Sequence, residues 1–79
     1  MNKQTEVLSE VHMHKKAVVV LIESNKILRR RFFDLGIIED TIIEPLFKSP
    51  MGDPTAYLIR GAVIALRSDE AEYIRVSLL

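Results

Sequence analysis

The pattern of hydrophobic and polar positions along the chain predicts five short strands. Ala17–Ile22 is a continuous apolar run rich in β-branched residues, which fit a packed strand and lose side-chain freedom in a helix. Strand character returns four more times, each time bounded by turn residues or by a short helical segment. These four segments are Thr41–Lys48, Thr55–Ile59, Ala62–Leu66 and Ile74–Leu78.

A helix is predicted between the first two strands. Leu28, Phe32 and Leu35 recur at i, i+4 and i+7, so they form one apolar stripe of a helix that runs from about Asn25 to Leu35. Gly36 directly follows this helix, as expected of a C-cap residue in the left-handed conformation, where a Cβ would cost energy.

Capping and turn residues mark further boundaries. Ser24 or Asn25 offers a side-chain oxygen to the free amides at the start of the first helix. Ser68 is expected to do the same for a short helix from about Asp69 to Tyr73. Gly61 supplies the positive φ of a tight hairpin turn, so the strands on its two sides should pair antiparallel.

Together these elements predict a mainly β fold. Five short strands are too few for a two-sheet sandwich and suit a small SH3-like barrel, with one α-helix after the first strand and a short helix before the last. We expect residues 1–79 to form a single domain in which residues 1–6 are flexible. The side chains of Leu8 and Val11 should pack a short turn against the barrel.

Composition argues against several functional classes. Eleven basic and eleven acidic side chains cancel, whereas nucleic-acid-binding domains concentrate positive charge, so no nucleic-acid partner is expected. No apolar run approaches the roughly 20 residues that span a bilayer, and the first ten residues lack the apolar core of a secretory signal. We therefore expect a cytoplasmic protein without membrane insertion. The absence of cysteine, of a P-loop and of a local Ser-His-carboxylate pattern argues against an enzyme.

Six short motifs follow one another along the chain: Arg31–Ile37 (RFFDLGI), Ser49–Pro54 (SPMGDP), Ile59–Gly61 (IRG), Ala65–Arg67 (ALR), Glu70–Ala71 and Ile74–Val76. No single motif is specific, but in order and spacing the series resembles the FeoA-type ferrous iron transport proteins. The resemblance covers roughly Leu8 to Val76. Its structural positions in this chain are Arg31, Leu35, Gly36 and Gly61.

The resemblance implies a small cytoplasmic SH3-like protein. It also implies a role beside a membrane ferrous iron transporter of the FeoB type, which carries a cytosolic GTP-binding domain. On this interpretation the protein docks on the cytosolic part of the transporter and modulates it, and any GTP hydrolysis is performed by the partner.

The chain departs from the family pattern at three places. Glu39-Asp40 replaces the usual Pro-Gly pair, and Asp is one of the few other residues that tolerate left-handed geometry. Phe32 replaces a leucine. Pro45 stands in a strand that is normally rich in valine, and because proline lacks an amide donor, we expect it at a sheet edge, a bulge or a bend.

The first candidates for contact with a partner lie on the predicted helix. Helical geometry points Arg30 outward, places Arg29 to one side and puts Phe33 away from the core stripe, where an exposed aromatic ring can anchor a partner. Arg31 borders the stripe, and we expect its stem to cover the barrel and its guanidinium to pair with Asp34 at i+3. A structural use of the arginines is the alternative.

A second candidate is the tip of the turn formed by Met51, Gly52 and Asp53. A protruding methionine suits an adaptable contact surface. The alternative is an exposed methionine without a function.

His12 and His14 are candidate ligands for a weakly bound divalent metal such as Fe²⁺. In an extended segment, residues two apart place both imidazoles on one face, and Glu10 could add a third ligand. No carboxylate–histidine cluster surrounds them, so two solvent-facing histidines are the competing interpretation, and we expect no required cofactor.

Three functional hypotheses follow. The chain is a docking module of a ferrous iron transporter, a small metal-binding protein, or a self-associating module. In the third case, a homo-oligomer would form through the apolar tail Val76–Leu79 and an edge strand near Pro45, because open strand edges invite partners.

Overall fold

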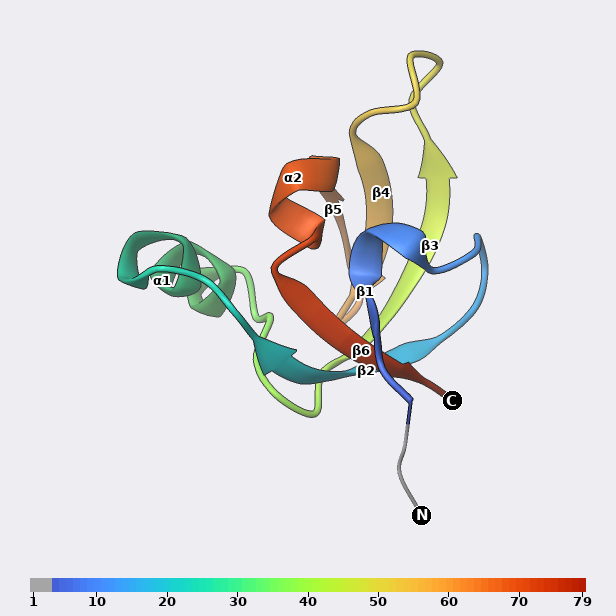
Figure 1. Ribbon diagram of the computed structural model, residues 1–79. Helices are drawn as coiled ribbons and strands as arrows, with labels where there is room; N and C mark the ends of the chain where they lie inside the picture. Colours follow the sequence, from blue (N-terminus) through green and yellow to red (C-terminus); the bar gives the residue numbers. More distant parts are fainter. Residues whose placement is uncertain (1–3) are drawn as a thin grey trace.

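In the computed structural model, which describes residues 4–79, one antiparallel sheet bends around a small core (Figure 1). Helix α1 joins β2 to β3, and the short helix α2 joins β5 to β6. The strands lie in the order β1-β6-β2-β3-β4-β5, and this is the predicted mainly β, SH3-like architecture. The elements are β1 Glu6–Val7, a 3₁₀ turn Leu8–Glu10, β2 Ala17–Ile22, α1 Lys26–Asp34, β3 Ile42–Lys48, β4 Thr55–Ile59, β5 Ala62–Leu66, α2 Ser68–Ala71 and β6 Ile74–Leu78.

Four of the five predicted strands have the predicted bounds, and β3 begins one residue later than expected. The sixth strand, β1, was not predicted, and Glu6 pairs with Val76 of β6 rather than being flexible. A polar residue can join an edge strand because the ladder uses backbone groups only. Residues 1–3, which share the expectation of flexibility, lie outside the described residues. Leu8 and Val11 are buried, as predicted.

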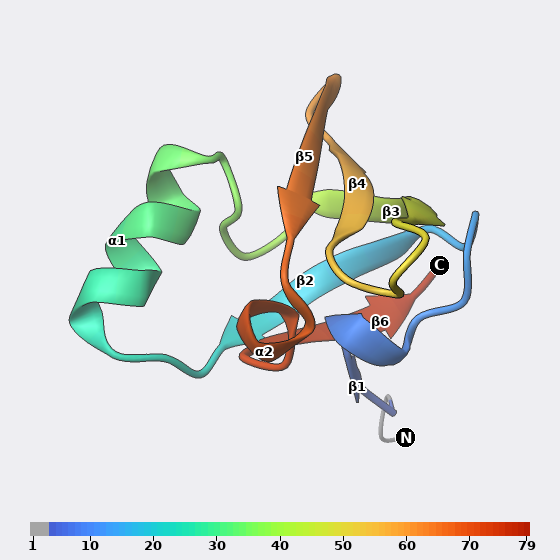
Figure 2. The same ribbon diagram turned by 90° about the horizontal axis from the view of Figure 1, so that it is seen from above.

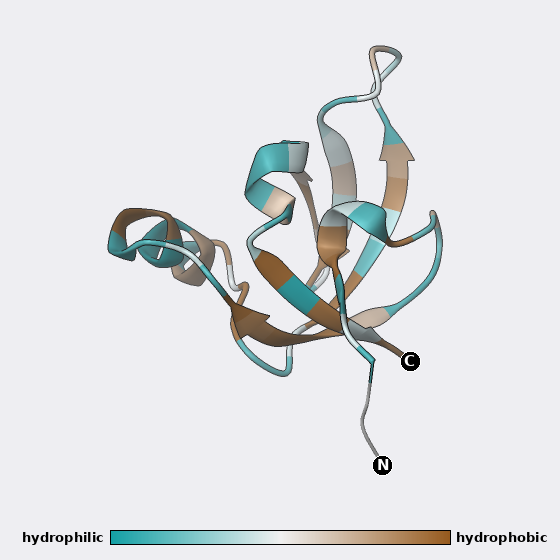
Figure 3. Cartoon of the chain, in the orientation of Figure 1, coloured by the Kyte–Doolittle hydropathy of each residue, from teal (hydrophilic) through white to brown (hydrophobic). Residues whose placement is uncertain are grey.

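The core lies on the inner side of the bent sheet. Figure 3 shows apolar residues mostly on the strands and polar residues mostly on the turns. Phe32 is the buried residue of α1, and Leu28 and Leu35 pack against the same cluster, which confirms the predicted stripe. Among residues 4–79, no helix is long and apolar enough to cross a bilayer. The largest fully buried side chains are Phe32, Leu8, Ile37, Ile43, Ile59, Leu66, Ile74, Val19, Val76 and Pro45.

Pro45 lies at a bulge, one of the three places predicted for it. The register between β3 and β4 shifts between Pro45 and Phe47. The bulge matters because β3 is paired on both sides, with β2 and with β4. The β2 ladder ends at Ile43, and beyond it the Pro45 carbonyl accepts a hydrogen bond from the His14 N–H, so the expected free edge at Pro45 is occupied. The two ends of the sheet are β1 and β5.

Left-handed residues close the turns where the sequence predicted them. Gly36 and Gly61 have φ of 84°, and Asp40, which takes the place of glycine in the family pattern, has φ of 74°. Arg60 also has positive φ, 51°, so both central residues of the β4–β5 turn are left-handed, which is the geometry of a type I′ hairpin. A Cβ on Gly36 would lie 2.8 Å from Cδ of Arg60.

Helix α2 begins one residue earlier than predicted, and its cap differs. Ser68 is the first helical residue instead of the cap, because its amide is satisfied by a distant side chain. Asp53 Oδ1 accepts hydrogen bonds from the Ser68 backbone N (2.8 Å) and from Ser68 Oγ (2.9 Å). A contact fifteen residues apart in sequence thus satisfies the first amide of α2.

Glu70 connects the two helices. One carboxylate oxygen, Oε1, accepts a hydrogen bond of 3.0 Å from the Arg67 backbone N just before α2. The other, Oε2, forms an ion pair with the guanidinium of Arg31 on α1. The predicted Arg31–Asp34 pair is wrong, because Asp34 pairs instead with Arg30, whose Nε lies 3.2 Å away at i, i+4. The Glu70 side chain is only 17% exposed, which favours a stronger pair than one on the open surface.

We predict that Glu70→Gln destabilises the fold. The substitution keeps the shape of the side chain but leaves the Arg31 guanidinium without its charged partner, at a cost of roughly 1–2 kcal/mol. Urea unfolding measures the loss, and Glu72→Gln, at an exposed position on the same segment, is the matched control. Equal unfolding free energies for the two variants would show that the charge of Glu70 does not stabilise the fold.

Because of Tyr57, the stability of the fold should decrease as the pH rises in the alkaline range. Burial is the main cause that raises the pKa of Tyr57; the nearby Asp53 charge adds to it, and a hydrogen bond with Thr55 opposes it. The unfolded chain therefore ionises first, at a pKa of about 10, and stability is lost as pH rises from there through the folded pKa. We expect Tyr57→Phe to flatten the fall of the urea midpoint above that pH, and Tyr73→Phe, at an exposed position, to leave it unchanged. A wild-type slope in Tyr57→Phe would contradict this assignment.

Candidate docking surface

The candidate site is built on α1, which lies beside the strands rather than across them (Figures 1 and 2). The helix has well-defined ends. Asn25 Oδ1 accepts a hydrogen bond of 2.8 Å from the Leu28 N–H. Of the two predicted cap residues, Ser24 and Asn25, the helix therefore uses Asn25. At the other end, the N–H groups of Gly36 and Ile37 donate to the carbonyls of Phe33 and Phe32, at 2.9 and 2.8 Å. These two bonds form a Schellman motif, which stops the helix at the glycine.

Three contacts hold α1 in place. Phe32 inserts into the core, where it is fully buried. Arg31 pairs with Glu70 of α2, and the guanidinium Nη2 of Arg29 donates a hydrogen bond to the carbonyl of Ile22 at the end of β2. All three contacts come from residues 29–32, within one turn of the helix, and the side chains of Ile27 and Phe33 are left exposed.

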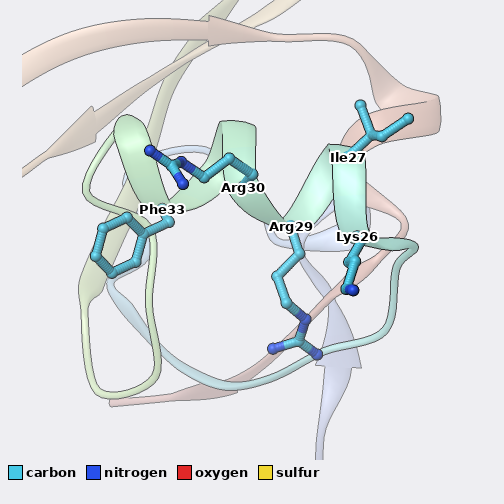
Figure 4. A pocket seen from close by; sticks show the side chains of 5 residues that line it. All are labelled: Lys26, Ile27, Arg29, Arg30 and Phe33. Carbon is cyan, nitrogen blue, oxygen red and sulfur yellow. The ribbon is translucent and has the colours of Figure 1, made fainter.

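Five residues make up this exposed side, which we call the α1 outer face: Lys26, Ile27, Arg29, Arg30 and Phe33. They line an open hollow of about 680 Å³ (Figure 4). Ile27 is 84% exposed and Phe33 63% exposed. In Figure 4, Lys26 and Arg29 point the same way and Ile27 points away from them.

The α1 outer face combines apolar side chains with positive charge. Helix α1 carries four basic residues and one acidic residue, and none of its acidic residues is in the first turn. A basic first turn opposes the helix dipole, so helix stability does not explain this charge pattern. Asp34 offsets part of the charge through Arg30. An acidic partner segment with apolar side chains would fit the face.

The structure brings Arg29, Arg30 and Phe33 together, as the helical pattern predicted. Sequence reasoning missed Lys26 and Ile27, although Lys26, Arg29 and Phe33 follow i, i+3, i+7 spacing, and Ile27 and Arg30 follow i, i+3 spacing. It also missed Ile38, which is 40% exposed and lines a neighbouring hollow of about 460 Å³ with Phe33.

The turn Ser49–Pro54 does not belong to the same surface. In both views it lies on another side of the barrel from α1 (Figures 1 and 2). Met51 is 92% exposed, and Gly52 beside it is also exposed. Asp53 is engaged with Ser68, and Ser49 Oγ donates a hydrogen bond of 2.6 Å to the Asp53 carbonyl. In this structure Asp53 shapes the turn and anchors α2, and its contact with a partner stays a prediction.

His12 and His14 lie in a turn rather than in an extended segment, and metal binding by them stays a prediction. His14 has φ of 69°, its N–H donates a hydrogen bond of 2.7 Å to the Pro45 carbonyl, and the Lys15 N–H donates to the His12 carbonyl at 3.2 Å. Both imidazoles are exposed. Within residues 4–79, no three His, Cys, Asp or Glu side chains are grouped so that they could hold a metal ion.

Comparisons with known proteins agree with this fold. The FeoA domain family matches residues 7–78. The fused Fe(2+) transport protein A/Fe(2+) transporter FeoB of Porphyromonas gingivalis is 32% identical over 72 residues, which are 91% of this chain and 8% of that protein. The chain therefore spans less than a tenth of that relative.

Solved structures are also similar. The FeoA-like protein of Clostridium acetobutylicum has 39% identity and a TM-score of 0.88, covering 100% of this chain and 91% of that one. The FeoA of Stenotrophomonas maltophilia, described as a prokaryotic SH3 domain protein in complex with zinc, has 29% identity and a TM-score of 0.78, covering 90% and 88%. By its sequence match and its fold, this chain belongs to the FeoA family, whose members are linked to ferrous iron transport.

Proposed function

We propose that this protein is a cytoplasmic accessory protein of ferrous iron uptake, which docks through the α1 outer face on the cytosolic part of a FeoB-type transporter and modulates it. The fused relative supports the choice of partner, because in it an FeoA domain and the transporter share one polypeptide. Any nucleotide hydrolysis would belong to the transporter, and this chain would supply a binding surface.

The exposed Ile27 and Phe33 on a positively charged helix are the observation that carries this proposal. Interfaces draw most of their binding energy from a few central anchors, among which aromatic residues are enriched, while surrounding charges set orientation and association rate. Phe33 and Ile27 would act as anchors, and Lys26, Arg29 and Arg30 would steer an acidic segment onto them.

Modulation requires that the transporter bind this surface more tightly in one of its conformations than in another. A helix fixed to a small barrel suits that task, since little ordering is needed on binding and little affinity is lost to it. In this proposal the barrel contributes no chemistry. It holds the α1 outer face in one orientation.

We predict that Phe33→Ala and Arg30→Glu each weaken binding to the purified cytosolic domains of a FeoB-type transporter by about tenfold, which is the effect of losing an interface anchor or of reversing a steering charge. Calorimetry or biolayer interferometry measures the dissociation constant. The Arg30→Glu effect should shrink at high salt, because ionic strength screens exposed charges.

The matched control is Phe47→Ala, which removes a phenylalanine of similar exposure, 59%, from β3 instead of α1. Met51→Ala tests the separate turn tip. Unchanged binding of Phe33→Ala together with weakened binding of Phe47→Ala or Met51→Ala would move the docking surface off α1. Absence of any binding by the wild-type protein would contradict the docking proposal itself.

A further inference from the structure

Strand β5 is a free edge of the sheet. Within residues 4–79 the strand order ends at β5, which pairs on one side only, with β4. Figure 2 shows β5 at the border of the sheet, on the side toward α1. The opposite border, β1, is only two residues long, whereas β5 has five residues.

The hairpin register identifies the backbone groups at this edge. The two-residue turn Arg60-Gly61 makes Ile59 and Ala62 a hydrogen-bonded pair. Bonded and non-bonded pairs alternate in an antiparallel ladder, so Ala62, Ile64 and Leu66 direct their N–H and C=O groups to β4. The N–H and C=O groups of Val63 and Ala65 point away from β4.

Nothing in the described part of the chain covers these outward groups. Among residues 4–79, the hydrogen bonds that lie outside helices and strands do not include Val63 or Ala65, and neither do those of side chains. Val63 is 60% exposed, and Ala65 is also exposed.

The strand also lacks the features that usually protect an edge. Natural sheets block edge pairing with charges, proline, bulges or very short strands. The β5 sequence, Ala-Val-Ile-Ala-Leu, has no charge and no proline, and its register with β4 runs without a bulge. Val63 lies opposite the exposed Leu58, which extends the apolar surface onto the outer face of β4.

We propose that β5 pairs antiparallel with β5 of a second copy of this chain, about a two-fold axis at Ile64. In this register Val63 faces Ala65 of the second copy, and Ala65 faces its Val63. Four backbone hydrogen bonds form, and every outward group of both strands is satisfied. The larger valine lies against the smaller alanine at both positions, so the side chains do not collide.

A second copy fits this edge because the edge is complementary to itself. The two outward residues, Val63 and Ala65, lie one on each side of Ile64. A two-fold axis at Ile64 therefore pairs each of them with the other residue of the second copy, as an isologous interface requires. The five residues of β5 carry no charge, so the paired strand residues do not repel one another and do not select a charged partner. The contact is independent of the proposed α1 docking surface, because the two share no residue.

The pairing is weak and reversible, since two five-residue strands bury less area than the roughly 1,200 Å² of a standard stable interface. Sedimentation and amide NMR spectra of the full chain, measured from micromolar to millimolar concentration, test it. We expect the apparent mass to rise from 9.0 kDa toward twice that value. The amide signals of Val63 and Ala65 should shift with concentration much more than those of Ala62 and Ile64.

Ala65→Pro is the decisive variant. It removes an outward N–H without removing any bond to β4, and edge strands tolerate proline at such positions. We expect it to stay folded and to lose the association, whereas Ala65→Ser, which keeps both the amide and a small side chain, should associate like the wild type. If Ala65→Pro fails to fold, Val63→Lys tests the same edge by placing a charge on it.

Three outcomes would overturn the proposal. The first is a constant mass of 9.0 kDa up to millimolar concentration. The second is association of Ala65→Pro or Val63→Lys as strong as that of the wild type. The third is protection of the Val63 and Ala65 amides only when transporter domains are added, which would assign the edge to a strand of that partner.

Discussion

The attachment of α1 to the barrel is the constraint on which the rest of the structure depends. One buried ring, Phe32, enters the core from the helix, and the Arg31–Glu70 pair fixes how the helix is turned. If either contact were lost, Ile27 and Phe33 could turn inward and bury their apolar surface. As the structure stands, the side of the helix that faces the barrel is fully used, and the outward side is free for a partner.

Long-range polar contacts give this small domain part of its rigidity. The chain has no cysteine, so no disulfide can supplement the core. Asp53 joins the β3–β4 turn to the first residue of α2, and Glu70 joins α2 to α1. The three segments come from different parts of the sequence and meet through two carboxylates. Asp53 and Glu70 therefore have a structural role, although the sequence alone would suggest ordinary surface charges.

Local patterns predicted the elements well, and contacts between distant segments were the part that the sequence did not reveal. Alternation, β-branching and turn glycines are local signals, and they located the strands and the helix around Phe32. The wrongly predicted contacts concern partners distant in sequence: Arg31 pairs with Glu70, the Ser68 amide binds Asp53, and Glu6 joins β6. Helical spacing found part of the α1 outer face but could not show that the turn at residues 49–54 lies elsewhere.

The protein is thus best described as a rigid support for one displayed helix. Nitrogen-15 relaxation of the backbone amides tests this description most directly. It predicts order parameters for α1 near those of the strands, about 0.85, because Phe32 and Arg31 tie the helix to the barrel. Values below about 0.6 across α1, with rigid strands, would mean that the helix moves independently and that its outward face is not held in one orientation.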